Sequence, residues 1–520
     1  MGKLDLQEGL SGEASSLAGT LGLDNLVLVW DDNSITIDAD TSEAFCEDVR
    51  ARYRAYGWRV LDIRDHTDLG EIERVLREAA DRSAAGGRPT LVALTSVIAA
   101  PSRKFGGKPA AHSGGFGAEE LAEVKLSLGF APEATLKELV APDVLAFTRR
   151  AVDRGRELEA GWAIREERWA SENPEDAGRW RAFRSGALRP ELHEVLDTVA
   201  DAIPVAGSLV ATRKTNGATM AALQPVSTLW GGSADLSGST SVSVPGSAVS
   251  AGKPGGEFIR FGIREHAMAA ILNGIALHGP WRPFGSTYLV FSDYMRPSIR
   301  LAALMALPVV YVFTHDSVAV GEDGPTHQPV EQLASLRTVP GLTVVRPADA
   351  AETVALWHRL VDDVGGPTVL ILSRQDIPVL PEREGLTEKV ASGGYVAWQH
   401  GAGSDLAIIA TGSEVHLAIA AAQQLAGEGV AARVVSMPSV EWFTASGQEH
   451  IDAILPPELT ARVAIEAGRG DAWWRWVGTR GEVVSVETFG ESGSGAEILA
   501  LCGITADNLL MAARRVLARR

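Results

Sequence analysis

The 520-residue sequence is poor in cysteine and in positive charge. Cysteine occurs only at Cys46 and Cys502, which excludes a disulfide framework and paired-cysteine metal sites and predicts two buried thiols in a reducing cytosol. The 48 lysines and arginines are outnumbered by 66 aspartates and glutamates. With a net charge of −18, the chain has no basic surface for nucleic acid or an anionic membrane. An anionic substrate would have to be held by local basic residues.

Long hydrophobic runs are also absent. The longest, Leu301–Phe313, contains Pro308 and is too short to cross a bilayer, which takes about 20 apolar residues. Met1 is followed by charged residues and by no apolar segment, so we expect no signal peptide and a cytoplasmic protein. The composition, 46% hydrophobic and 22% charged, is typical of a soluble globular protein, and the length predicts about three domains.

The first part of the chain alternates predicted helices and strands. Helices are predicted at 8–22 and 41–56 and after Asp68, and strands at 26–33, 58–63 and 89–98. This β-α-β-α order indicates a parallel sheet that helices cover on both faces. The chain opens on a helix with no strand before it, so we expect the sequence to begin inside the fold.

A charged segment separates this part from two further α/β stretches. Residues 132–190 are crowded with arginine and glutamate, and we interpret them as a surface crossing between domains. Strand and helix patterns then resume and continue to a terminal helix at 506–519. The predicted fold class is therefore α/β, with three α/β domains built on parallel sheets, at residues 1–180, 181–392 and 393–520.

Polar residues stand at the carboxyl ends of several predicted strands, in "WDDN", "FGIREH", "FTHDS" and "LSR". Ligands bind at such strand ends in open parallel sheets, although each of these residues alone would also suit a helix cap. The stretch "THDSVAVGEDGPTHQPVEQ", Thr314–Gln332, is the most distinctive. Its spacing fits either a ligand-binding loop or an irregular turn with a capping histidine.

Seven motifs together resemble the transketolase family: "GIREHAM", "THDSVAVGEDGPTHQPVEQ", "GGSADLSGS", "STYLVFSDY", "LSRQ", "ATGSEV" and "TFGESG". The resemblance runs in order from about Leu6 to the C-terminus. It implies a thiamine diphosphate enzyme of the pentose phosphate pathway, which moves a two-carbon ketol unit between sugar phosphates. It also implies a homodimer whose cofactor lies between the diphosphate-binding domain of one subunit and the pyrimidine-binding domain of the other, with a third, C-terminal domain.

The resemblance assigns several residues to the cofactor. Glu265 matches the glutamate that binds N1′ of the aminopyrimidine and favours the tautomer that removes the thiazolium proton. The alternative reading, a carboxylate at a helix N-terminus, is worth only ~0.3–1 kcal/mol. The aromatic pocket of the pyrimidine ring is matched by Tyr288, Phe291 and Tyr294, and their i, i+3, i+6 spacing would place them on one face of a helix. His112 matches a residue near the diphosphate, and Glu8 matches an acid that links paired active sites.

The resemblance likewise assigns a sugar phosphate site. His315 and His327 match the histidines that contact the hydroxyls and carbonyl of the sugar, and Asp323 matches the residue that reads its C2 hydroxyl. His112 also lies near the substrate in the family. Arg213, Ser239 and Arg374 match the residues that bind the phosphate group. Guanidinium groups suit phosphate because each can hold two oxygens.

The resemblance fails at the metal motif. Asn33, by its side chain, and Ile35, by its carbonyl, match ligands of a Mg²⁺ or Ca²⁺ ion, but Gly2, Lys3 and Leu4 replace the "GDG" motif. A lysine cannot ligate such an ion, so we expect an N-terminally truncated chain with little activity alone. The alternatives are a non-catalytic or partner-dependent fragment, or an enzyme like 1-deoxyxylulose-5-phosphate synthase, which Gln328 and "LSRQ" disfavour.

Overall fold

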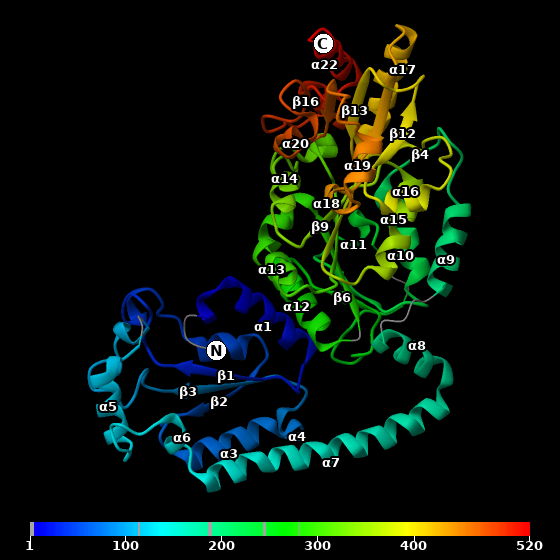
Figure 1. The fold of residues 1–520 in the computed structure, drawn as a ribbon. Coiled ribbons are helices and arrows are strands. Elements are labelled where there is room, and N and C mark those ends of the chain that lie inside the picture. Colours follow the sequence, from blue (N-terminus) through cyan, green and yellow to red (C-terminus); the bar gives the residue numbers. More distant parts are fainter. Residues whose placement is uncertain (1–4, 113–114, 186–189, 243–245, 280, 520) are drawn as a thin grey trace. The chain divides into compact units, whose positions relative to one another are not determined.

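The computed structural model describes residues 5–112, 115–185, 190–242, 246–279 and 281–519 (Figure 1). Lys3 and its neighbours Gly2 and Leu4 lie outside these described residues. The chain divides into two compact units, Met1–Ser185 with Ser250–Pro254, and Gly186–Val249 with Gly255–Arg520. The predicted boundary between residues 392 and 393 falls inside the second unit, between two of its sheets.

The first unit is built on a parallel sheet of three strands in the order β1-β3-β2. Its main elements are α1 (Gly9–Leu21), β1 (Val27–Asp32), α2 (Val49–Ala55), β2 (Arg59–Ile63), α3 (Leu69–Ala80) and β3 (Thr90–Thr95). Tyr53 of α2 packs with Trp30 and Leu91 on one face of the sheet, and Val75 of α3 packs with Val92 on the other. The parallel sheet covered on both faces is as predicted.

Two local expectations for the first unit are wrong. The helix predicted at 41–56 begins only at Val49, because the Asp48 side chain caps it by accepting from the Ala51 backbone N–H at 2.9 Å. Before it, Thr41–Glu43 forms a single 3₁₀ turn. Cys46 lies in the intervening loop and is exposed, so it is no buried thiol.

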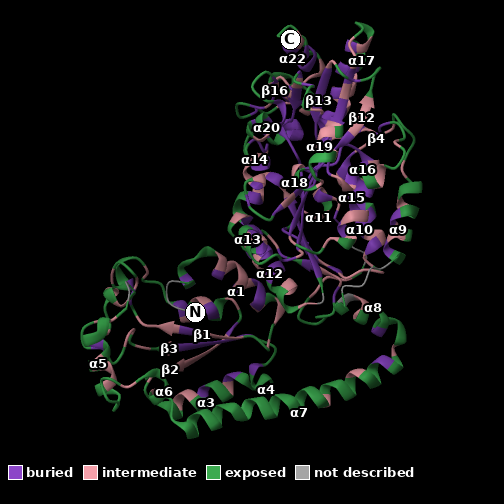
Figure 2. Cartoon of the chain, in the orientation of Figure 1, coloured by how far each residue is buried: buried purple, intermediate pink, exposed green. Residues whose placement is uncertain are grey.

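The charged segment forms long exposed helices. After η3 (Pro109–His112), α5 (Gly117–Ser127) and α6 (Leu136–Leu139) come α7 (Pro142–Glu172) and α8 (Pro174–Ser185). Figure 2 shows α7 exposed along almost its whole length, and Ala170 is its buried residue. Pro174 begins a new helix after Asn173, since proline suits a first helical turn and disrupts a helix interior.

A six-stranded parallel sheet organises the first part of the second unit, in the order β6-β5-β7-β8-β10-β9. Its strands are β5 (Leu229–Ser233), β6 (Phe258–Arg260), β7 (Arg282–Tyr288), β8 (Val310–Thr314), β9 (Thr343–Val345) and β10 (Thr368–Leu372). The helices around it are α9 (Pro190–Asp201), α10 (Thr212–Leu223), α11 (Ser237–Thr240), α12 (Glu265–His278), α13 (Ser292–Leu304), α14 (Gln332–Arg337), α15 (Ala350–Asp362) and α16 (Leu386–Ala391). Since the strands are parallel, their carboxyl ends share one edge.

A second sheet of five strands, β12-β14-β13-β15-β16, organises the rest of this unit, with β12 antiparallel to β14 and the other neighbours parallel. Its elements are β12 (Tyr395–Gln399), β13 (Leu406–Ala410), α17 (Val415–Gly427), β14 (Ala432–Ser436), α18 (Val440–Ala445), α19 (Gln448–Ile454), β15 (Arg462–Ile465), α20 (Trp474–Val477), β16 (Glu482–Val484), α21 (Gly495–Leu501) and α22 (Ala506–Leu517). Gly495–Leu517 is long and apolar enough to be a candidate membrane span. Here it forms two helices, and Leu509 and Ala513 of α22 pack into the core of this sheet.

The close pairing of β5 with β7 generates a stability prediction. A Cβ atom on Gly231 would overlap the carbonyl oxygen of Phe284 on the neighbouring strand, so Gly231→Ala should lower the free energy of unfolding by about 1–3 kcal/mol. Gly274, exposed within α12, has no atom within 4 Å of such a Cβ. Gly274→Ala should raise stability by up to about 1 kcal/mol. Urea unfolding of both variants checks this, and equal effects would contradict it.

Candidate active site

The shared carboxyl edge of the six-stranded sheet carries many of the predicted site residues. Tyr288 ends β7, His315 follows β8, Arg374 follows β10, Ser239 lies on α11 after β5, and Glu265 begins α12 after β6. Five separate stretches of sequence thus reach one edge because their strands run in the same direction. This is the edge at which ligands bind in open parallel sheets.

Two hydrogen-bonded residues place the arginines of this site side by side. Thr212 donates its backbone N–H to Ser373 Oγ at 3.0 Å, and the Ser373 N–H donates to Thr212 Oγ1 at 2.8 Å. Arg213 and Arg374 are the next residues along the chain. Just beyond them in the fold, β4 (Leu209–Val210) pairs antiparallel with β11 (Ile377–Pro378), which holds the two segments together.

In the described part of the chain, the carboxylate contact of these two arginines is a long one, from Arg374 to Glu322. Burial, followed by the positive charge of Arg374, lowers the pKa of Arg213. The Arg213 guanidinium donates to the Ser239 backbone carbonyl. Arg374 is 3.9 Å from Glu322, a carboxylate that is largely exposed. The arrangement concentrates positive charge within a strongly acidic chain, which favours a dianionic ligand such as a phosphate ester.

His315 is the buried centre of the site, with 2% of its surface exposed. Burial, and then the charges of Arg213 and Arg374, lower its pKa to about 3, so the ring is neutral at pH 7. Its Nδ1 lies 2.8 Å from Thr314 Oγ1, which leaves Nε2 as the ring nitrogen for a ligand. Its backbone is in the left-handed region, with φ of 61°, which is strained for a residue other than glycine.

An aromatic group surrounds the two histidines. The Tyr288 ring stacks on His315 at 3.6 Å between centroids, and it lies 5.8 Å from the Phe291 ring with 8° between their planes. His327 meets the edge of Phe291 at 5.6 Å, and the Tyr294 ring lies 6.1 Å from Phe291. These contacts join the aromatic and histidine motifs, which are distant in sequence, into one cluster.

The expectation that the three aromatic residues share one helix face is wrong. Tyr288 is the last residue of β7, Phe291 lies in the 3₁₀ turn Leu289–Phe291, and Tyr294 lies in α13 and is 63% exposed. Their rings approach because the chain turns directly from strand to helix. The i, i+3, i+6 spacing therefore predicted the grouping for the wrong reason.

Glu265 is a nearly buried carboxylate, 9% exposed, at the first position of α12. Arg264, just before it, donates to the Phe261 carbonyl at 2.9 Å. The helix N-terminus favours a negative charge at this position, and the lack of water strengthens any hydrogen bond that Glu265 makes. Such a carboxyl group suits a ring nitrogen of a ligand.

The distinctive loop after β8 has a defined structure. Val318–Asp323 forms the 3₁₀ segment η5, with Asp323 exposed at its end. His327 Nδ1 lies 2.9 Å from Thr326 Oγ1, so the histidine bonds to its neighbouring side chain. Buried Gln328 donates to the carbonyls of Gly321 at 2.8 Å and Glu491 at 2.9 Å, which fixes the loop to the C-terminal segment.

The first unit holds the remaining predicted residues. Asn33, after β1, donates to Asp31 Oδ2 at 3.1 Å and accepts from the Ile35 N–H at 3.1 Å. Glu8 is exposed at the N-terminal end of α1, and His112 is exposed at the end of η3. Among the described residues, no group of three or more His, Cys, Asp or Glu is placed to hold a metal ion. Asn33 and Ile35 therefore lie together, without an accompanying carboxylate cluster.

Sequence reasoning missed the buried polar residues that support the site. Asp316 follows His315 and is 2% exposed, and it pairs with Arg346, which is fully buried. No local pattern marks this pair, because its members are 30 residues apart and neither stands in a recognisable spacing. The motif "ATGSEV" contains a further partner, Glu414, but carries no local sign of its role.

Comparison with known proteins covers nearly the whole chain. Family models match residues 1–188 (Transketolase, thiamine diphosphate binding domain), 208–379 (Transketolase, pyrimidine binding domain) and 393–505 (Transketolase-like TK C-terminal domain). The transketolase of Mycobacterium tuberculosis is 44% identical over 99% of this chain and 74% of its own length, and that of Halalkalibacterium halodurans is 42% identical over 99% and 76%.

Solved structures agree with these relatives. The transketolase from Leishmania mexicana superimposes with a TM-score of 0.91 at 35% identity, over 100% of this chain and 75% of its own. A Pichia stipitis transketolase in complex with sedoheptulose 7-phosphate gives the same TM-score and identity, over 100% and 76%. The chain thus spans about three-quarters of the length of these relatives.

The buried neutral His315 generates a prediction about pH. In the unfolded chain the ring takes up a proton below its ordinary pKa of 6.5, whereas the folded protein resists protonation down to about pH 3. The unfolded chain binds more protons between these values, so this group makes stability fall with falling pH, by up to about 1.4 kcal/mol per pH unit. Urea unfolding at pH 7, 6 and 5 should show a weaker pH dependence in His315→Gln. The exposed His278→Gln is the control, and the same slope in all three proteins would contradict the assignment.

Proposed function

We propose that the residues around His315 form the sugar phosphate site of this chain, which belongs to the transketolase family. Its reaction is the thiamine diphosphate-dependent transfer of a two-carbon ketol unit between a ketose phosphate and an aldose phosphate in the pentose phosphate pathway. The observation that carries this proposal is a neutral, buried histidine beside two arginines whose carboxylate contact, among the described residues, is the long pair of Arg374 with Glu322 at 3.9 Å. That combination offers hydrogen bonds to a sugar and charge to a phosphate.

In this proposal the arginines bind the phosphate group. Arg213 and Arg374 stand on adjacent, hydrogen-bonded segments, so their guanidinium groups can hold different oxygens of one phosphate. Ser239 lies on the short helix α11, and its backbone carbonyl accepts a hydrogen bond from Arg213, so its hydroxyl lies beside the arginines. Their local charge accounts for how a chain with a net charge of −18 takes an anionic substrate.

The histidines and Asp323 would bind the sugar itself. His315 keeps Nδ1 on the Thr314 hydroxyl and His327 keeps Nδ1 on the Thr326 hydroxyl, so each ring presents Nε2 to the substrate. The neutral imidazole of His315 can donate or accept a proton at that atom, as movement of a proton to or from a sugar hydroxyl or carbonyl requires. The exposed carboxylate of Asp323 would accept a hydrogen bond from the C2 hydroxyl.

The pyrimidine half of the cofactor fits the described residues. Bound thiamine diphosphate supplies the electron sink for cleavage and formation of the carbon–carbon bond. Glu265, nearly buried at a helix N-terminus, would hold N1′ of the aminopyrimidine in a hydrogen bond that water does not weaken. The flat surfaces of Tyr288 and Phe291, with Tyr294 beside them, would pack on the ring.

The metal half fits less well. We propose that Asn33 Oδ1 and the Ile35 carbonyl bind a Mg²⁺ or Ca²⁺ ion and that His112 lies near the diphosphate. We also propose that the protein is a cytoplasmic homodimer, in which Glu8 links the paired active sites. Such ions take six or more oxygen ligands, usually with carboxylates among them, and the described residues of the first unit place no carboxylate cluster there. We further propose domain boundaries at residues 180 and 392. The poor donor set also keeps a partner-dependent or non-catalytic chain as the second candidate function.

Removal of one phosphate-binding arginine tests the site. Arg374→Ala should weaken the binding of a ketopentose 5-phosphate about 10- to 100-fold, the loss expected for charged hydrogen bonds. Isothermal titration calorimetry measures this, with Arg469→Ala as the control, since the Arg469 guanidinium is occupied by its pairs with Asp471 and Glu487. Equal affinities of the Arg374 variant and the wild type would rule out the proposed site.

The donor set that the described residues offer predicts weak cofactor binding by this 520-residue chain. Calorimetry with thiamine diphosphate and Mg²⁺ should give weak affinity, and a coupled ketol-transfer assay should give little turnover, because the described residues bring no group of three or more acidic or histidine side chains to the ion. Asn33→Ala should then abolish what metal dependence the affinity shows. Robust turnover by the purified chain would contradict this prediction and remove the second candidate function.

A further inference from the structure

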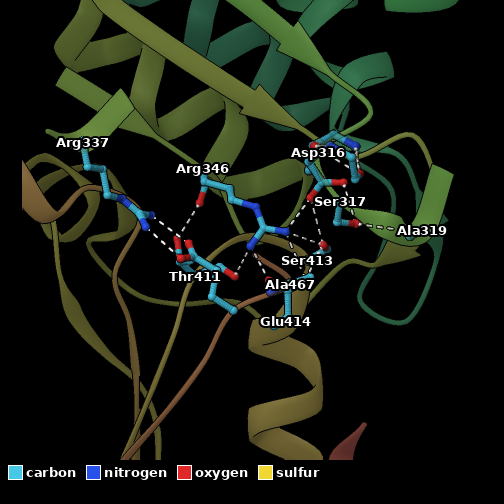
Figure 3. A network of polar contacts seen from close by, with 12 residues as sticks. Asp316, Ser317, Ala319, Arg337, Arg346, Thr411, Ser413, Glu414 and Ala467 are labelled. Atoms are coloured by element: carbon cyan, nitrogen blue, oxygen red, sulfur yellow. Dashed lines mark hydrogen bonds and ion pairs between the residues drawn. The ribbon is translucent and has the colours of Figure 1, made fainter. Parts of the chain in front are cut away.

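Arg346 is a fully buried arginine that follows β9 and lies between the two sheets of the second unit (Figure 3). Its Nη2 donates to Asp316 Oδ2 at 2.7 Å and to Glu414 Oε1 at 3.0 Å, and its Nη1 donates to the other oxygen of Glu414. Asp316 belongs to the six-stranded part and Glu414 to the five-stranded part. One guanidinium therefore joins the two.

The turn that contributes Glu414 is shaped around this guanidinium. The Gly412 N–H donates to the Arg346 carbonyl at 3.1 Å, and the Thr411 carbonyl accepts from Arg346 Nη1 at 3.1 Å. Gly412 has φ of 58°, and a Cβ atom there would lie 2.6 Å from Arg346 Cγ. Only glycine permits this backbone to lie flat against the arginine.

Ser413 completes the contact with Asp316. Its hydroxyl lies 3.0 Å from Asp316 Oδ2 and 2.7 Å from Glu414 Oε1, and it accepts from Arg346 Nη2 at 3.1 Å. Burial alone would lower the pKa of Arg346, but attraction to Glu414 and Asp316 outweighs it and raises that pKa. The charges are thus compensated within a narrow geometry, because displacement of either carboxylate would leave a buried charge unpaired.

Asp316 connects this network to the proposed sugar phosphate site in two directions. The preceding residue is His315, whose strained φ of 61° needs support from its surroundings. The following residue, Ser317, lies 3.4 Å from Asp316 Oδ1 and caps η5, accepting from the Ala319 N–H at 3.3 Å. Since η5 ends at Asp323, Asp316 stands between two of the groups proposed to bind the sugar.

We propose that Arg346 and Ser413 are positioning residues, through which the C-terminal sheet sets the conformation of His315 and η5 for the sugar phosphate. Neither residue touches the substrate; both act through Asp316. The inference rests on the proposed function, and it assigns the C-terminal part of the chain a role in sugar phosphate affinity. The bonds of Gln328 to Gly321 and Glu491 support the far end of the same loop from the same part of the chain.

Ser413→Ala is the variant that tests the proposal, because it removes one hydroxyl and keeps the ion pairs. Ser436→Ala is the matched control. Ser436 is likewise a buried serine of the C-terminal part, and it donates to Glu352 Oε1 at 2.6 Å, on helix α15 of the six-stranded part. No described contact of Glu352 involves the loop at 315–327.

Both variants should lower the thermal midpoint by similar amounts. In calorimetry of the cofactor-supplemented chain, Ser413→Ala should weaken ketopentose 5-phosphate binding about 5- to 10-fold, and Ser436→Ala should change it less than about 2-fold. In ¹⁵N-histidine spectra, the His315 signals, assigned with His315→Asn, should move in Ser413→Ala and stay in Ser436→Ala.

The outcomes separate this inference from the proposed function. Unchanged affinity and unchanged His315 signals in Ser413→Ala, with weakened binding in His315→Asn, would overturn the positioning role alone. Equal losses in both serine variants would also overturn it, because they would report general destabilisation. Wild-type affinity in His315→Asn, or no binding by the wild type, would defeat the proposed function, and the histidine spectra would still decide the coupling.

Discussion

The ion pairs of buried Arg346 with Asp316 and Glu414 are the interaction on which the arrangement of the proposed site depends. They occupy the place where the carboxyl edge of one sheet meets a turn of the other. A buried guanidinium tolerates few geometries, since each carboxylate that moves away leaves an uncompensated charge. The left-handed backbone of His315, next to Asp316, is thereby supported by contacts from a part of the chain far along the sequence.

Electrostatics explains why this edge suits a sugar phosphate. The chain is acidic overall, yet Arg213 and Arg374 stand close together, and burial with these two charges keeps His315 neutral. A charged histidine there would add to the repulsion between the arginines. A neutral ring instead offers a hydrogen bond to a hydroxyl or carbonyl while the guanidinium groups hold the phosphate.

Sequence alone predicted the parallel sheets and the edge that carries the proposed site, because alternation of strands and helices and polar residues at strand ends are local patterns. It placed Tyr288, Phe291 and Tyr294 together but on the wrong element, since spacing cannot distinguish a helix face from a strand that turns into a helix. The Arg346 network escaped prediction because its partners come from separate motifs and meet only after two sheets pack. The transketolase family was indicated by several whole motifs in order, whereas no single residue would have indicated it.

The central proposal is that His315 is a neutral ring beside two arginines at a sugar phosphate site. The most direct measurement is the ¹⁵N spectrum of the His315 imidazole, recorded across pH and with added ketopentose 5-phosphate. We expect a ring that stays neutral to below pH 5 and whose Nε2 signal shifts when the sugar phosphate is added. A ring that titrates near its ordinary pKa of 6.5 and does not respond to the sugar phosphate would contradict the account.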